Sequence, residues 1–183
     1  MKVAFIGTHG VGKTTLCYGL AARLKARDIT LELVHEVARR CPLPINEETS
    51  LASQSWILHT QLAEEVVAQA RYPVVICDRS VLDNYVYLVL AAGRQDALEH
   101  LVADWLDTYD LLVLVPITEE PQADGFRTTN PEFQRLIETR VIRELEDRGR
   151  PALRLDPTAR ESWLEDVERE VLERLDERQL RLL

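Results

Sequence analysis

The chain has 183 residues, of which 46% are hydrophobic and 29% charged, a composition and length that predict one ordinary globular domain. Its 22 basic and 31 acidic side chains give a formal net charge of −9, which argues against indiscriminate binding to nucleic acid or anionic lipid. No apolar run approaches the length of a membrane span, and the N-terminus enters an apolar segment without a signal-peptide pattern, so we expect a cytoplasmic protein.

The first predicted elements are a strand, a glycine-rich turn and a helix. Residues 3–6 form a short apolar run, and Leu16, Leu20 and Leu24 fall on one stripe of a helix. Glycines let backbone N–H groups turn toward a phosphate, and a helix N-terminus adds partial positive charge. The sequence between strand and helix is a complete G-x-x-x-x-G-K-[ST] phosphate-binding loop, Gly7-Thr8-His9-Gly10-Val11-Gly12-Lys13-Thr14, followed by Thr15.

We expect this whole loop to bind the phosphates of a nucleotide. Lys13 would reach the β- and γ-phosphates, and the Thr14 hydroxyl would ligate Mg²⁺. The alternative is a glycine turn that binds nothing.

Four further strands are predicted at residues 31–35, 74–77, 111–115 and 152–155. The runs at residues 74–76 and 111–115 do not alternate with polar residues, which is typical of strands buried on both faces of a parallel sheet. Helical stripes cover about residues 48–71 and 80–92. Asn130-Pro131 predicts the start of a further helix, and Thr158-x-x-Glu161 is a capping box that predicts the last one. This alternation predicts a three-layer α/β domain over residues 1–183, with a five-stranded parallel sheet flanked by helices.

Charged side chains follow two of the predicted strands, at the sheet edge where ligands bind in such folds. Asp78 comes directly after the third predicted strand, where it would hold Mg²⁺, or would instead cap the next helix. Arg79 offers a planar fork of donors to an anion, unless it is a surface arginine. Glu36 would accept a proton from an attacking hydroxyl, and Arg39 and Arg40 would clamp an anionic group of the acceptor. A solvated helix start is the alternative for these last three residues.

Residues 117–130 carry few signals of regular structure. They include Asp124-Gly125-Phe126-Arg127. Such a stretch predicts a lid that brings Arg127 onto the transferring phosphoryl group, with an ordinary surface loop as the alternative.

Together these segments resemble the P-loop nucleoside and nucleotide kinases. They are most similar to a group of small AAA-type kinases that includes the ribosylnicotinamide kinase domain of a bacterial NAD-biosynthesis regulator. The similarity rests on residues 7–15, 36–39, 78–80 and 124–127, and residues 78–85 also resemble segments of deoxynucleoside and thymidylate kinases. The resemblance implies that Asp78 serves the metal or the acceptor, that Arg79 serves the transferred phosphate, and that Glu36 is the base.

The sequence departs in three places from the motifs of other P-loop proteins and of some kinases. No second carboxylate follows Asp78, which argues against a mechanical AAA+ machine. Pro116-Ile117-Thr118-Glu119 stands where a GTPase would carry its guanine signature. Arg127 is not followed by another arginine until Arg135, whereas lids of deoxynucleoside kinases have several closely spaced arginines.

The expected function is ATP- and Mg²⁺-dependent phosphoryl transfer to a nucleoside, a nucleotide or a related small molecule. A polynucleotide 5′-hydroxyl kinase and a regulatory NTPase switch are the alternatives. The expected partners are thus a nucleoside triphosphate and a small phosphoryl acceptor, with nucleic acid only as an acceptor end and no membrane. A homodimer is left open.

Overall fold

The computed structural model describes residues 1–45, 48–119 and 129–180. Its centre is a sheet of five strands in the order β2-β3-β1-β4-β5, with every neighbouring pair parallel. The first strand in the chain is therefore the central strand of the sheet. The strands are β1 (Lys2–Ile6), β2 (Leu31–Val34), β3 (Val74–Asp78), β4 (Leu111–Leu114) and β5 (Leu153–Arg154).

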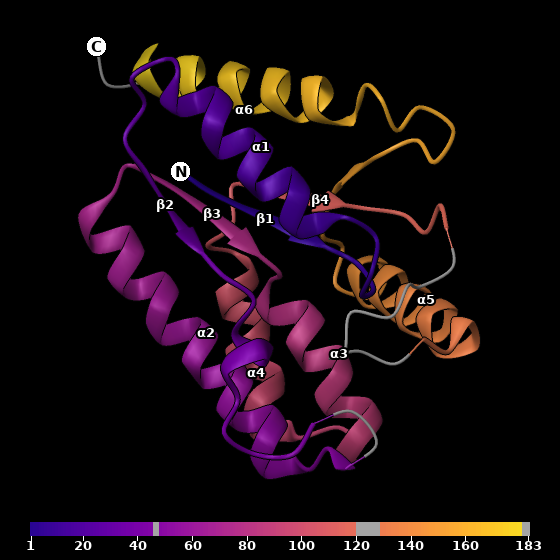
Figure 1. Cartoon of the computed structure of the whole chain (residues 1–183). Helices are drawn as coiled ribbons and strands as arrows, with labels where there is room; N and C mark the ends of the chain where they lie inside the picture. Colours follow the sequence, from indigo (N-terminus) through magenta and orange to yellow (C-terminus); the bar gives the residue numbers. More distant parts are fainter. Residues whose placement is uncertain (46–47, 120–128, 181–183) are drawn as a thin grey trace.

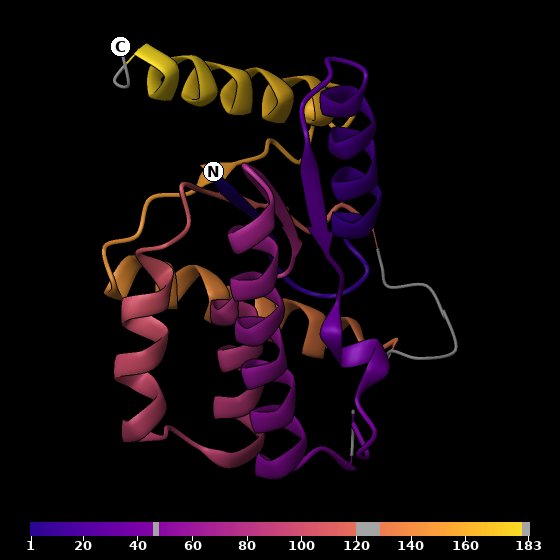
Figure 2. The same ribbon diagram turned by 90° about the vertical axis from the view of Figure 1, so that its left-hand side faces the viewer.

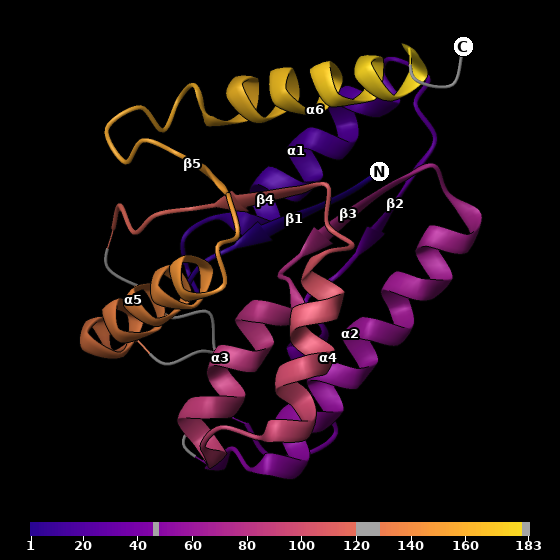
Figure 3. The same ribbon diagram turned by 180° about the vertical axis from the view of Figure 1, so that it is seen from behind.

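Helices cover both faces of the sheet, so the predicted three-layer α/β architecture is confirmed. On one face lie α1 (Lys13–Lys25) and α6 (Trp163–Leu180) (Figure 1). The views in Figures 2 and 3 place the other helices on the opposite face: α2 (Leu51–Arg71), α3 (Val81–Ala92), α4 (Asp96–Leu106) and α5 (Pro131–Asp147). A short 3₁₀ helix, η1 (Val37–Arg40), follows β2. Among the described residues, no helix is both long and apolar enough to cross a bilayer.

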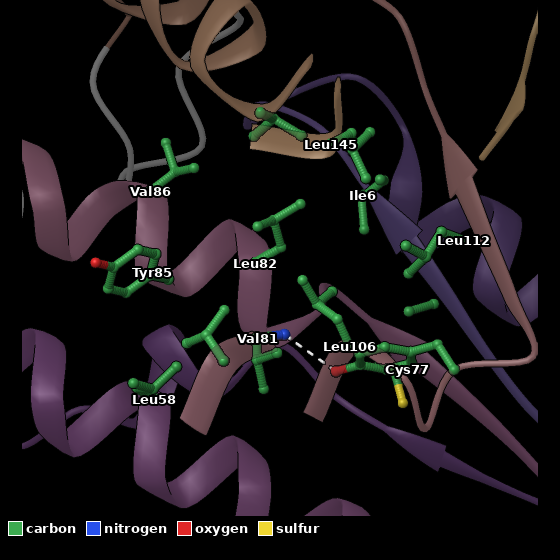
Figure 4. Packing of buried hydrophobic residues seen from close by; sticks show 14 of the residues in the cluster. Ile6, Leu58, Cys77, Val81, Leu82, Tyr85, Val86, Leu106, Leu112 and Leu145 are labelled. Atoms are coloured by element: carbon green, nitrogen blue, oxygen red, sulfur yellow. Dashed lines mark hydrogen bonds between the residues drawn. The ribbon is translucent and has the colours of Figure 1, made fainter. Parts of the chain in front are cut away.

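After Lys2, the central strand β1 is apolar from Val3 to Ile6 because both of its faces are buried. Val3 and Phe5 belong to a core cluster beneath α1 and α6, whereas Ala4 and Ile6 belong to the cluster beneath the other helices. Figure 4 shows this second cluster, in which Ile6 lies near Leu82 of α3. Because both faces of β1 are buried, no polar residue alternates along it.

Two predictions about helices were wrong. Thr158 does not begin a helix, because its backbone N–H and its hydroxyl both donate to Asp156 Oδ1, at 2.8 and 2.7 Å, and so form a local turn. The last helix begins instead at Trp163, whose indole N–H donates to the Asp156 carbonyl oxygen at 2.6 Å. The sequence analysis also missed α4, although Leu98, Val102 and Leu106 have helical spacing. It placed a single helix, ending near Gly93, between the third and fourth predicted strands.

All three cysteines are free thiols. Cys17 and Cys77 are buried, and this burial raises the pKa of both thiols well above the ordinary value. They therefore stay protonated and pack as small apolar side chains.

Candidate active site

The phosphate loop connects the carboxyl end of β1 to the start of α1, where the sequence predicts it. Gly7, Gly10 and Gly12 have positive φ angles of 130°, 76° and 92°. A Cβ at Gly7 would lie 2.7 Å from the carbonyl oxygen of Val115, so only glycine fits there. At Gly12 no side chain caps α1, whereas α2, α3 and α5 begin at Ser50, Ser80 and Asn130, whose side chains accept backbone N–H groups. A helix start of this kind fits an anionic ligand.

Lys13 is almost completely buried beneath this loop. Its Nζ donates to the Gly7 carbonyl oxygen at 3.0 Å and also to the Thr8 carbonyl oxygen. Burial, and then the positive charge of Arg79, lower the pKa of Lys13 to about 7. A phosphate placed against this ammonium would favour its charged form and raise that pKa again.

Asp78 is the last residue of β3 and pairs in register with Phe5 of β1. Its Oδ2 accepts a hydrogen bond from the Thr14 hydroxyl at 2.5 Å. The alternative role of Asp78 as a helix cap is wrong, because the cap of α3 is Ser80, whose Oγ accepts from the Leu82 N–H at 3.1 Å. The carboxylate of Asp78 therefore faces the start of α1, as a metal-binding role requires.

The Thr14–Asp78 pair fits a magnesium ion that is shared with a nucleotide. Magnesium is commonly bound through one or two protein groups together with substrate phosphates and water. Within the described ranges, no group of three or more His, Cys, Asp or Glu side chains could hold a metal by itself. Because the Thr14 proton is donated to Asp78, the lone pairs of the hydroxyl oxygen are left for a cation.

Arg79 and Glu36 form a buried ion pair at the same edge of the sheet. The Arg79 Nε lies 2.7 Å from Glu36 Oε1, and the two side chains are only 5% and 3% exposed. Glu36 Oε2 accepts from Arg39 Nε at 2.9 Å. Burial acts to lower the pKa of Arg79, but the carboxylate of Glu36 outweighs this effect and raises it, so Arg79 is charged. The two predicted site residues that follow β2 and β3 are thus brought together.

Two further features of Arg79 are typical of residues at ligand-binding sites. Its φ of 91° is unusual for a residue with a side chain, and such strain concentrates at functional sites. Its Nη1 is buried without a hydrogen-bond partner in the part of the chain that the structure describes. A buried guanidinium N–H without an acceptor is costly, so an arriving anion would be bound strongly there.

Comparisons with known proteins agree with this arrangement. The model of the AAA domain family matches residues 2–166. The chain belongs to the AAA domain family. A thymidylate kinase of Psychrobacter sp. (strain PRwf-1) is 28% identical over 153 residues, which cover 72% of this chain and 74% of that kinase.

A solved structure extends the similarity to nearly the whole AAA domain protein. The deoxyadenosine kinase of M. mycoides, described with the products dCMP and a flexible dCDP bound, superposes with a TM-score of 0.61 at 16% identity, covering 97% of this chain and 100% of that one. The predicted membership of the P-loop nucleoside and nucleotide kinase superfamily is confirmed. The narrower similarity to ribosylnicotinamide kinases stays a prediction.

The structure of this AAA domain protein does not gather all predicted site residues. Arg40 turns away from the Glu36–Arg79 pair, because its guanidinium binds Glu64 of α2 at 2.5 Å on the surface. Thr15 is exposed on the first turn of α1. Arg127, the rest of residues 124–127 and most of the predicted lid lie outside the described residues.

Asp83 is a site residue that the sequence analysis missed. Its Oδ1 accepts from the Gly7 N–H at 2.8 Å, and its Oδ2 accepts from the Ser80 N–H and hydroxyl, both at 2.9 Å. Asp83 therefore fixes the first glycine of the phosphate loop to the N-terminus of α3. The spacing Ser80-x-x-Asp83 could have predicted the cap, but the contact with Gly7 is visible only in three dimensions.

Proposed function

We propose that this protein is a P-loop kinase that transfers the γ-phosphoryl group of ATP, with Mg²⁺, to a nucleoside, a nucleotide or a related small molecule. The observation that carries this proposal is the buried Arg79 guanidinium beside the phosphate loop, whose Nη1 has no hydrogen-bond partner among the described residues. A regulatory switch needs no such second anion site. The names of the relatives, a thymidylate kinase and a deoxyadenosine kinase, support the same class of reaction.

Each side chain of the candidate active site has a role in this proposal. Lys13 and the loop amides hold the β- and γ-phosphates, and Thr14 and Asp78 hold the magnesium ion, which neutralises phosphate charge. Arg79 stabilises the charge on the transferring phosphoryl group. Glu36 orients Arg79 and takes the proton of a hydroxyl acceptor. Arg39, which reaches Glu36 from η1, binds an anionic group of the acceptor, and Arg127 remains a proposed lid residue.

A panel of acceptors tests the proposal. Purified protein, ATP and Mg²⁺ are incubated with nucleosides, nucleoside monophosphates, nicotinamide riboside and a 5′-hydroxyl oligonucleotide, and phosphoryl transfer is measured. Transfer to a small acceptor is expected, and Lys13→Ala should reduce kcat by about 10²–10³-fold. Transfer only to the oligonucleotide, with binding that weakens steeply with salt, would favour the polynucleotide kinase. Absence of transfer to every acceptor would refute the kinase proposal.

The magnesium requirement should depend on the pair that joins α1 to β3. Thr14→Ala and Asp78→Asn are each expected to raise the Mg²⁺ concentration that gives half-maximal activity, because each removes a group assigned to the ion. Activity is titrated against Mg²⁺ at saturating ATP. Thr139→Ala is the control, because that hydroxyl donates to the Arg135 carbonyl oxygen within the exposed part of α5. An unchanged titration curve for Asp78→Asn would remove Asp78 from the metal site.

Binding of ATP should be accompanied by proton uptake at pH 8. With a pKa of about 7, Lys13 is mostly neutral at this pH. If bound phosphates hold it charged, up to about 0.9 of a proton enters on binding, and affinity falls as the pH rises above 7. Calorimetry in buffers of different ionisation enthalpy measures the uptake, with Lys13→Met as the variant that should abolish it. Equal proton uptake by wild type and Lys13→Met would assign the proton to another group.

A further inference from the structure

Tyr87 of α3 contacts both parts of the proposed site. Its hydroxyl oxygen lies 3.1 Å from Nδ1 of His9 in the phosphate loop. The central guanidinium carbon of Arg79 lies 5.2 Å from the centre of the Tyr87 ring. One tyrosine side chain therefore joins the loop that would hold the donor phosphates to the arginine that would stabilise the transferring phosphoryl group.

The phosphate-loop end of this link is held from α5. Phe133 lies against both rings, with its ring centre 6.0 Å from that of His9 and 6.2 Å from that of Tyr87. The side-chain amide of Gln134 donates to the His9 carbonyl oxygen at 3.0 Å and is buried. Because the backbone and the ring of His9 are both held, the hydroxyl of Tyr87 has a fixed hydrogen-bond partner.

At the other end of the link, the ring of Tyr87 affects the direction in which the Arg79 guanidinium group points. The ion pair with Glu36 holds Nε, but it does not by itself fix the plane of the guanidinium group. An aromatic ring close to a guanidinium restricts that plane, since the cation interacts with the face of the ring. The plane in turn sets the direction of the unpartnered Nη1.

We propose that Tyr87 is a positioning residue that orients Arg79 toward the phosphate loop, and that His9 fixes the Tyr87 hydroxyl for this purpose. The inference rests on the proposed function, in which Arg79 contacts the transferring phosphoryl group. Tyr87 acts through Arg79 and not on the substrate. Its loss therefore affects the rate of transfer more than the binding of ATP, which depends on the loop and Lys13.

Substitution of Tyr87 tests this role in two steps. Tyr87→Phe keeps the ring and removes the bond to His9, and kcat should fall by about 3–10-fold. Tyr87→Leu removes the ring as well, and kcat should fall by about 10–100-fold. The KM for ATP should change little in both. Tyr85→Phe is the matched control on the same helix, because its hydroxyl donates to Glu99 at 2.5 Å, away from the phosphate loop, and it should retain the wild-type kcat.

A double-mutant cycle distinguishes the loss of Arg79 positioning from a general disturbance of the fold. The same Tyr87 variants are made with Arg79→Gly, and transfer from radiolabelled ATP is measured with the best nucleoside or nucleoside monophosphate of the acceptor panel. If Tyr87 acts through Arg79, its substitution has no further effect in that background. An equal loss in both backgrounds, or a wild-type kcat for folded Tyr87→Leu, would overturn the inference. Absence of transfer by the wild type would instead refute the proposed function.

Discussion

Arg79→Gly should lower kcat by about 10³-fold and leave the protein folded. An arginine that stabilises the transition-state charge of phosphoryl transfer contributes about 10³–10⁵-fold. Glycine adopts the φ of 91° found at this position without steric cost, and Glu36 keeps its ion pair with Arg39. Steady-state kinetics with the best acceptor measures the loss, and thermal unfolding checks the fold.

Arg79→Ala is the matched comparison. It should lose as much activity as Arg79→Gly but unfold at a lower temperature, because its Cβ is strained at a positive φ. Arg169→Ala, which removes an exposed arginine of α6, should retain wild-type activity. A folded Arg79→Gly protein with more than about one tenth of the wild-type kcat would contradict the role given to Arg79.

Glu36→Gln is expected to lower kcat for a hydroxyl acceptor by about 10²–10⁴-fold, with little change in the acceptor KM. The amide has nearly the size of the carboxylate but cannot take a proton. An acceptor that is already a phosphate needs no strong base, because its oxygen is ionised at neutral pH. For that acceptor the main effect should be a higher KM. Kinetics with a nucleoside and with its monophosphate therefore distinguish the two kinds of kinase.

The ion pair of Glu36 calls for a second measurement. Both of its oxygens accept from guanidinium groups, and glutamine has only one acceptor oxygen, so either the bond from Arg79 Nε or that from Arg39 Nε is lost in the variant. If Glu36 is a base, its substitution still lowers kcat when Arg79 is glycine. If it only holds Arg79, the further loss disappears in that background. A Glu36→Gln protein that merely unfolds at lower temperature, with normal kinetics, would remove Glu36 from the site.

The parts of the fold and site that follow from short sequence patterns were predicted correctly. The phosphate loop, the positions of the five strands and the N-terminus of α5 each depend on residues that are neighbours in the chain. The parallel arrangement of the strands also predicts that Glu36 and Arg79 lie at the same edge of the sheet. It does not predict their ion pair, because that pair depends on how the backbone of Arg79 turns after β3.

The other site contacts could not be predicted, since their partners are distant in the sequence. Tyr87 and Gln134 have the spacing of ordinary helical residues, and nothing in their local sequence indicates contact with His9. Asp83 satisfies a helix cap and the phosphate loop together, but only the first of these is a local pattern. The turn at Asp156 shows the reverse case, in which a local side-chain bond replaced the helix start that the spacing suggested.

The central place of β1 in the sheet has a consequence during protein synthesis. β1 is synthesised well before its partners in the sheet: the Lys2 N–H is bonded to Asp110, 108 residues further along the chain. At about 5–20 residues per second, the nascent strand waits about 5–20 s for β4. The backbone edge of β1 that pairs with β4 is exposed during this time and is a target for chaperones or aggregation. The phosphate loop depends on the same pairing, because Gly7 lies against the carbonyl oxygen of Val115, directly after β4.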